Sequence, residues 1–309
     1  MRRIISFYIT AFLTILGYWA VGAQNNTNIT QWMFARSNFN PASTGINKGM
    51  EFMLWDREQW IGLEGRPSSQ MLNANFYVKP LHGGLGATIS YDRIGPQSNL
   101  NLRVNYAYHA TLNEKAFLTI GVGAGFMYTN TKSGELVFAN PQDPVMNNFN
   151  ENKFLPDVAA GLELNHKNYI IGLSATQLIG GPTSKYPYFA RGLNLYGNYS
   201  FNIKNKARIV PGLLVRSPFF TTQFEGNLLA YFLKDRVWIG AAYRFQDAVS
   251  AIVGAEVIKG LRVGYSFDYS LGGARPYNTG THEVMLMFSM KKPRKHQPFY
   301  NNPRNYFKI

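Results

Sequence analysis

The sequence predicts an all-β protein, a transmembrane antiparallel β-barrel of about 14 strands. From about Gly49 onward, apolar and polar residues alternate in one segment after another, and a period of two is typical of strands with two different faces. Turns rich in Gly, Pro, Asn or Lys close these segments. No apolar stretch long enough for a spanning helix follows the first 23 residues, so strands must cross any membrane that this chain crosses.

The first 23 residues have the pattern of a secretory signal peptide. Arg2 and Arg3 precede the apolar run Ile4–Ala20, and small residues end at Ala23. A membrane anchor is the alternative, but the run is short for a span and no cluster of stop-transfer charges flanks it. We therefore expect cleavage after Ala23 and export to the cell outer membrane.

The chain is strongly basic, with 31 Lys and Arg against 17 Asp and Glu and a formal net charge of +14. In an exported protein this charge fits anionic lipid or an acidic protein partner, and we expect no nucleic acid partner. The chain has no cysteine, which excludes disulfides, thiolate metal sites, cysteine nucleophiles and lipidation at the cleavage site.

Four parts are expected along the chain: a signal peptide at 1–23, an N-terminal periplasmic segment at 24–48, the outer-membrane β-barrel at 49–292 and a basic periplasmic tail at 293–309. The alternation is clearest near the end of the barrel. There we assign the face with Val263, Tyr265 and Phe267 to lipid and the face with Ser266 and Asp268 to the lumen. Aromatic residues crowd the segment ends, where the two interfacial girdles of a barrel belong.

Every second connection is short, and the others are mostly longer, as in barrels with short periplasmic turns and longer outer loops. The short turns and the tail share basic residues, which we call the basic rim: Lys79, Lys115, Lys167, Lys204, Lys206, Lys234, Arg236, Lys259, Lys291, Lys292, Arg294 and Lys295. We expect the basic rim to be periplasmic and to bind a partner. Contact with anionic lipid headgroups is an equally good reading.

Two segments depart from a regular strand pattern. One face of residues 121–125 is all glycine, which predicts a bend or a close approach to something in the lumen, and no helix follows to make it a nucleotide-binding loop. Pro211 lies in mid-strand and predicts a bulge or strained pairing.

No catalytic, metal or cofactor-binding residue is predicted, and we expect no enzyme. The acids Asp56, Glu58 and Glu64 are more simply explained by ion pairs with Arg57 and Arg66 within the first outer loop than by acid and base catalysis. The five histidines show no metal-binding spacing.

Two outer loops stand out. The loop around Trp60 folds inward as a partial plug or anchors a tryptophan at the membrane interface, and both readings stay open. The long polar loop 130–154 is a partner-binding surface or an ordinary extracellular loop, and its length favours the first.

A series of short motifs runs through the chain in a fixed order. It comprises Asn40-Pro41-Ala42 with Gly45; a loop with Arg57, Gln59, Trp60, Gly62, Gly65 and Pro67; Ile94-Gly95-Pro96; Tyr106-Ala107-Tyr108; Pro156-Asp157 with Gly161; Gly172-Leu173-Ser174; Gly264-Tyr265-Ser266; and Gly280-Thr281-His282-Glu283-Val284. Each motif alone is weak, but in this order they are specific. The chain resembles the PorP/SprF family, outer-membrane proteins of the type IX secretion system of Bacteroidetes.

The resemblance implies a non-enzymatic barrel that anchors a protein secretion or gliding motility assembly. Its expected partners are other type IX secretion components, periplasmic and outer-membrane lipoproteins, or secreted surface proteins, with outer-membrane lipid around the barrel. It implies no cofactor. The alternative function on the same architecture is a porin or small-solute transporter, and an outer-membrane enzyme such as a lipase is a weaker third.

Overall fold

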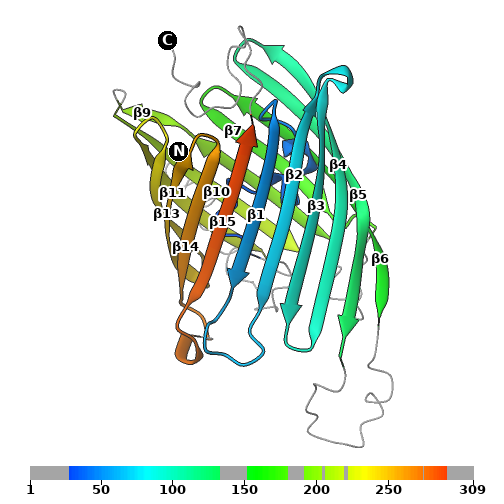
Figure 1. Cartoon of the computed structure of the whole chain (residues 1–309), viewed down its shortest axis with the longest axis vertical. Helices are drawn as coiled ribbons and strands as arrows, with labels where there is room; N and C mark the ends of the chain where they lie inside the picture. The colour runs from blue at the N-terminus through cyan, green and yellow to red at the C-terminus, as the bar shows by residue number, and fades with distance from the viewer. Residues whose placement is uncertain are drawn as a thin grey trace, which may run out of the picture.

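The structure, a computed structural model, describes residues 28–132, 152–179, 191–203, 206–218, 222–273 and 275–290. The strands in these ranges form one antiparallel sheet that closes on itself, because β1 (Met50–Glu58) pairs with β15 (Thr281–Met290) (Figure 1). β9 (Phe201–Ile203) continues β8 (Gly192–Tyr199), and both pair with β10 (Ala207–Pro218). The 15 strands thus make a closed 14-strand barrel, as the sequence predicts.

The remaining strands follow in chain order around the barrel. They are β2 (Ser68–Val78), β3 (Gly83–Ile94), β4 (Gln97–Asn113), β5 (Ala116–Thr131), β6 (Lys153–His166), β7 (Tyr169–Thr176), β11 (Gln223–Phe232), β12 (Val237–Arg244), β13 (Ala248–Ile258) and β14 (Leu261–Ser270). Two 3₁₀ turns lie in connections, η2 (Lys79–Leu81) and η6 (Arg275–Tyr277). In the described ranges, no helix is both long and apolar enough to span a membrane.

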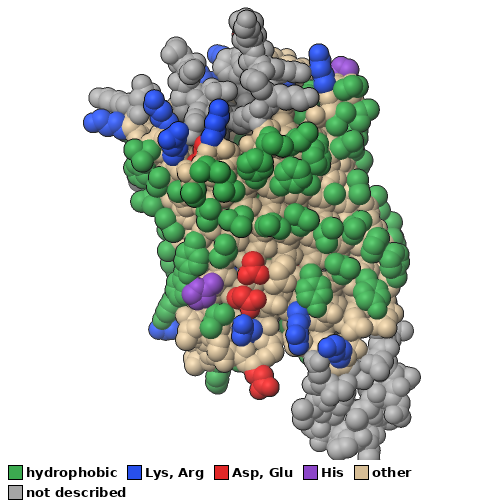
Figure 2. All heavy atoms as spheres, viewed as in Figure 1, with side chains coloured by type: hydrophobic (Ala, Val, Ile, Leu, Met, Phe, Trp, Pro, Cys, Tyr) green, Lys and Arg blue, Asp and Glu red, His purple; other side chains and the backbone are tan. Residues whose placement is uncertain are grey.

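The two faces of the sheet differ as expected. In β14, Ser266 and Asp268 are buried, whereas Tyr265 and Tyr269 are exposed on the outside. The same alternation puts large apolar side chains on the outer surface of most strands, and Figure 2 shows hydrophobic side chains across this surface. An apolar outer wall around a polar interior is the pattern of a barrel in lipid.

The pairing of β10 is interrupted near Pro211. β10 pairs with β8 from Gly212 onward and with β9 up to Ile209, so the neighbouring strand breaks at Ser200. Proline has no N–H to donate to a ladder, which explains why this position lacks a partner on that side. The structure therefore shows a break in the adjacent strand rather than the bulge predicted at Pro211, and the pairing with β11 continues in register through this residue.

Residues 28–48 lie inside the barrel, and we call this segment the plug. It contains α2 (Arg36–Phe39) and η1 (Pro41–Ser43), drawn in dark blue within the barrel in Figure 1. Trp32 and Ala42 are fully buried. The sequence leads us to expect a periplasmic segment at 24–48, and its described part differs because its apolar side chains pack against the inner wall, including Tyr196 and Trp238.

The loop around Trp60 does not fill the lumen. It lies at the barrel mouth, where the Ile61 N–H donates to the Gly280 carbonyl at 2.9 Å and the Trp60 N–H donates to the Thr281 hydroxyl at 3.2 Å. The loop therefore packs against the β14–β15 connection. Residues 28–48 fill most of the lumen, whereas Gln59 and Trp60 line the cavity at its mouth, so both expectations for this loop stay predictions.

Candidate functional site

The plug is held on the side of the longer loops by a buried charged cluster. Thr30 and Gln31 donate their backbone N–H groups to the two carboxylate oxygens of Glu283, at 2.9 and 2.8 Å. The Thr30 hydroxyl donates to the Asp268 carboxylate at 2.8 Å and accepts from Arg57 at 3.0 Å. The same hydroxyl also accepts from Arg244 at 3.1 Å, so one residue of the plug contacts four charged side chains from four strands.

Two arginines balance the carboxylates of this cluster. Arg57 contacts Asp268 at 2.7 Å and Glu283 at 2.9 Å, and Arg244 contacts Glu225 at 2.9 Å. All five side chains are buried. A charge removed from water is costly unless it is paired and hydrogen-bonded, so each member depends on the others. The cluster therefore fixes the position of the plug relative to β1, β11, β12, β14 and β15.

A second anchor lies across the lumen on β6 and β8. The Asn40 side-chain amide donates to the Leu162 carbonyl at 3.1 Å and to the Tyr196 hydroxyl at 2.9 Å. The Ser43 hydroxyl donates to the Glu163 carboxylate at 2.5 Å, and the Tyr196 hydroxyl also donates to Glu163. The first anchor thus attaches the plug to strands around the junction of β1 and β15, and the second attaches it to β6 and β8 across the lumen.

Glycines on the inner wall let the plug backbone approach closely. A Cβ at Gly121 would lie 2.2 Å from the Ala42 nitrogen, and one at Gly84 would lie 2.2 Å from the Thr44 carbonyl oxygen. Gly45 has a φ of +68°, which favours glycine, and its own Cβ would meet the Gly84 Cα at 2.4 Å. The close approach predicted from the glycine face is confirmed at Gly121.

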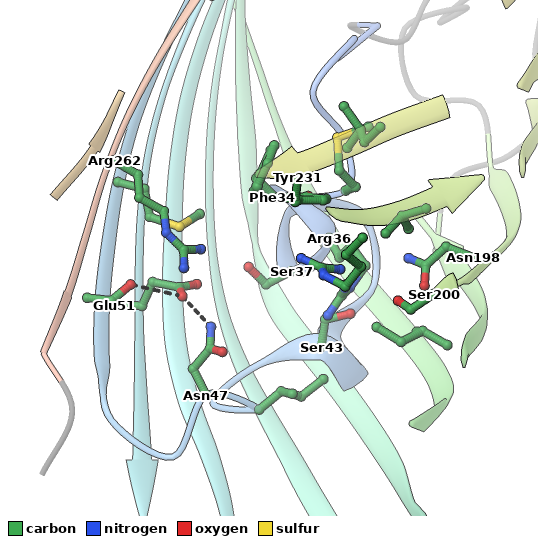
Figure 3. Close-up of a pocket in the computed structure, with 18 of the residues that line it drawn as sticks. Phe34, Arg36, Ser37, Ser43, Asn47, Glu51, Asn198, Ser200, Tyr231 and Arg262 are labelled. Carbon is green, nitrogen blue, oxygen red and sulfur yellow. Dashed lines mark hydrogen bonds between the residues drawn. The ribbon is translucent and has the colours of Figure 1, made fainter. Parts of the chain in front are cut away.

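A cavity lies on each side of the plug, and each has a volume of about 270 Å³. The loop-side cavity is lined by Phe39, Arg57, Trp60 and Arg244, among others. The turn-side cavity, shown in Figure 3, lies between the plug residues Phe34 and Arg36 and wall residues such as Tyr231 and Arg262. The plug thus separates two chambers that open toward opposite ends of the barrel.

The structure places the described members of the basic rim together at the short-turn end. Figure 2 shows Lys and Arg side chains around this upper end. The exposed members are Lys79, Lys115, Lys206, Lys234, Arg236 and Lys259, and Lys167 is half-buried. Four tail members and one turn member lie outside the described residues: Lys291, Lys292, Arg294, Lys295 and Lys204.

The residues of the Trp60 motif divide between lumen and loop. Gln59, Trp60 and Pro67 line the loop-side cavity, and Gly62 and Gly65 have φ values of +101° and +68°. These glycines permit the tight course of the loop at the barrel mouth.

The expected ion pairs of this loop are right for one arginine and wrong for the other. Arg66 pairs with Glu58 at 3.0 Å in solvent, as predicted. Arg57 instead points into the lumen and pairs with Asp268 and Glu283, because position 57 belongs to β1 and the strand period turns its side chain inward.

Sequence reasoning missed the plug and both of its anchors. Thr30 belongs to no recognisable motif, and Glu163 has only the pattern of a polar position in a strand. Glu283 stood in the motif at residues 280–284, but nothing in that motif indicates a contact with residues 30 and 31. Asn40 stood in the Asn-Pro-Ala motif, but nothing in its spacing indicates a lumen position. Among the described residues, no group of three or more His, Cys, Asp or Glu is arranged to hold a metal ion.

The fold and these features can be compared with known proteins. Solved structures with a similar fold include the toluene transporter TbuX of Ralstonia pickettii, at 10% identity and a TM-score of 0.50, covering 81% of this chain and 91% of that one. They also include the outer membrane protein Omp33 of Acinetobacter baumannii, at 11% identity and a TM-score of 0.48, covering 80% and 100%. The chain matches no curated protein.

A family model supplies the identity. The model, described as the type IX secretion system membrane protein PorP/SprF, matches residues 21–288, which is most of the chain and includes the plug, both anchors and all the barrel strands but the end of β15. Together with the closed barrel, this match shows that the chain belongs to the PorP/SprF family of type IX secretion system membrane proteins.

Proposed function

We propose that this protein is an outer-membrane anchor of the type IX secretion machinery that works with a closed lumen and binds partners at its basic rim. The observation that carries the proposal is the plug. Its ends are fixed by Glu283 and Glu163 from distant strands, and its backbone fits against glycines of the wall. A solute channel would need a continuous aqueous path, whereas a scaffold needs a rigid body.

The basic rim supports partner binding at the short-turn end. Six of its members are exposed, and although the described turns at this end also carry the exposed carboxylate of Glu114, basic side chains outnumber it. A ring of like charge raises the local concentration of acidic surfaces and speeds their encounter, and salt weakens this because the Debye length is about 8 Å at physiological ionic strength. We infer that the rim faces the periplasm and contacts acidic surfaces of periplasmic or lipoprotein components of the machinery.

The location is part of the proposal. Export by the signal peptide, cleavage after Ala23 and insertion into the outer membrane agree with the family and with the apolar outer wall of the barrel. Mass spectrometry of the native protein from isolated outer membranes should find Gln24 as its first residue.

The rim is tested by charge removal. Lys79, Lys206, Lys234 and Arg236 are changed to glutamine together, and the control changes the loop-end residues Arg66, Arg93 and Arg275 to glutamine. Both variants should insert and show the heat-dependent gel mobility of a folded barrel. Partners should co-purify from native membranes with the control but be reduced several-fold with the rim variant. Unchanged partner recovery with the rim variant would assign the rim to lipid headgroups.

A porin or small-solute transporter remains the alternative function, and it is tested independently. The purified protein in planar bilayers should show no stable, solute-selective conductance. Stable openings of the unmodified protein would replace the closed scaffold with a transporter.

A further inference from the structure

The turn-side cavity has the features of a binding site rather than of a packing defect. Its floor is apolar, with Phe34 and Met33 from the plug facing Leu229, Tyr231 and Met287 from the wall. Phe34 packs against Trp238 with ring centroids 5.3 Å apart and ring planes tilted by 45°, so this floor has a defined shape. A volume of about 270 Å³ accommodates one or two large side chains.

The mouth of this cavity is polar and mainly cationic. Its cationic residues are Lys167, Lys259 and Arg262, and its anionic residues are Glu51 and Glu256. Two deeper arginines also line the cavity, but each has a buried acid as partner. Arg36 lies 3.3 Å from Glu163, and Arg208 lies 3.0 Å from Asp235.

The surroundings of the mouth add further positive charge. Lys206, Lys234 and Arg236 are exposed on neighbouring turns at the same end. A group entering from this end therefore meets a positive field first and an apolar floor second.

One buried polar atom also lacks a partner here. Asn227 lines the cavity and is only 9% exposed, and its Nδ2 finds no hydrogen-bond partner among the described residues. A buried donor without an acceptor is costly, so a small rotation of this amide toward the cavity would be favourable if the carbonyl of an entering chain accepted from it. Asn198 and Ser200, labelled in Figure 3, add polar groups on the same wall.

We propose that the turn-side cavity receives a short acidic peptide segment of a partner protein, in which one large hydrophobic side chain enters the floor while flanking carboxylates contact Lys259 and Arg262. This rests on the proposed function, because it names the chemistry by which a partner binds at the short-turn end. The sequence of residues 291–309 does not fit the chemistry of this occupant, since it contains six basic residues and no acidic one. A tail of the same sign as the mouth is repelled by it.

The proposal is tested with purified full-length protein in detergent and a synthetic peptide. The probe is a short fluorescein-labelled peptide in which one phenylalanine lies between pairs of glutamates, and binding is followed by fluorescence anisotropy. Two control peptides replace the phenylalanine by serine or the glutamates by glutamines. We expect both to bind at least about tenfold more weakly than the probe, because each lacks one of the two required contacts.

Variants then locate the binding. Ser200→Trp fills the turn-side cavity without a change of charge, and Asn99→Trp fills the loop-side cavity as a matched control. Arg262→Gln removes a mouth charge, and Arg66→Gln removes an exposed charge at the opposite, loop end of the barrel. Ser200→Trp should weaken binding at least about tenfold and Arg262→Gln several-fold, whereas the two controls should bind as the unmodified protein does.

The outcomes separate this proposal from the function proposed above. If the probe does not bind the folded protein, or binds the Ser200→Trp variant equally well, the cavity is not its site and the inference is wrong. Loss of native partners in the rim variant would still support the anchor in that case. Conversely, the peptide could bind in the cavity while the rim variant recovers its partners in unchanged amount. That result would overturn the proposal that the rim binds partners and would support peptide binding in the cavity.

Discussion

Adding one methyl group at Gly121 should displace the plug. The alanine Cβ would lie 2.2 Å from the Ala42 nitrogen, 2.3 Å from the Pro41 carbonyl carbon and 2.5 Å from the Ala42 Cα. All three obstacles are backbone atoms, so no rotamer change relieves the overlap. Overpacking of this kind lowers the stability of a protein by about 1–3 kcal/mol. Because the obstacles are rigid, we expect Gly121→Ala to cost an amount near the upper end of this range or to displace the plug from the wall.

A matched substitution gives the baseline. Gly226 lies in β11 and a Cβ there would meet nothing within 4 Å, so Gly226→Ala should be neutral or stabilising by less than about 1 kcal/mol. Hydrogen exchange of residues 28–48 and urea unfolding in detergent measure the two effects. Gly121→Ala should speed exchange throughout the plug and Gly226→Ala should not. Equal exchange and equal unfolding midpoints in the two variants would refute the close contact between plug and wall.

Three further predictions concern charge, lipid and orientation. Glu283→Gln should destabilise the barrel by about 3 kcal/mol, since it removes one of the two carboxylates that compensate the buried charge of Arg57. Glu58→Gln should cost less than about 1 kcal/mol because its ion pair is exposed; similar urea midpoints for both would contradict the buried cluster. Val253→Arg, on the outer wall in mid-strand, should cost about 2–4 kcal/mol if that wall faces lipid, and unchanged stability in vesicles would exclude this. Because the chain has no cysteine, Glu64→Cys should react with an impermeant maleimide on intact cells and Lys206→Cys should not, and the reverse labelling would invert the barrel.

The barrel could be predicted from the sequence because strand alternation is a local signal. The neighbours Tyr265 and Ser266 point to opposite faces of the strand, so the alternation within one strand is enough to predict which side chains form the outer wall. The charged turns are local in the same sense, so the described rim residues lie together as expected.

The interior could not be predicted because its contacts join distant parts of the chain. Thr30 and Glu283 are 253 positions apart, and no period or spacing relates them. The partners of Arg57 were predicted wrongly for the same reason. Its acidic neighbours in the sequence point to the other face of β1, and its actual partners, Asp268 and Glu283, come from distant strands. Only the glycines at 121–125 indicated a lumen contact, since they mark where a side chain is missing, and the sequence does not say what replaces it.

The position of the plug at the beginning of the chain bears on the order of assembly. The seat around Ser43 is complete once β8 has been made, but the seat around Thr30 requires β14 and β15 at the other end of the chain. The pairing of β15 with β1 that closes the barrel thus coincides with the formation of the last contacts to the plug. We expect the growing sheet to curl around a segment already attached to its first half, so that a chain lacking its final strand would leave both the wall open and the plug half attached.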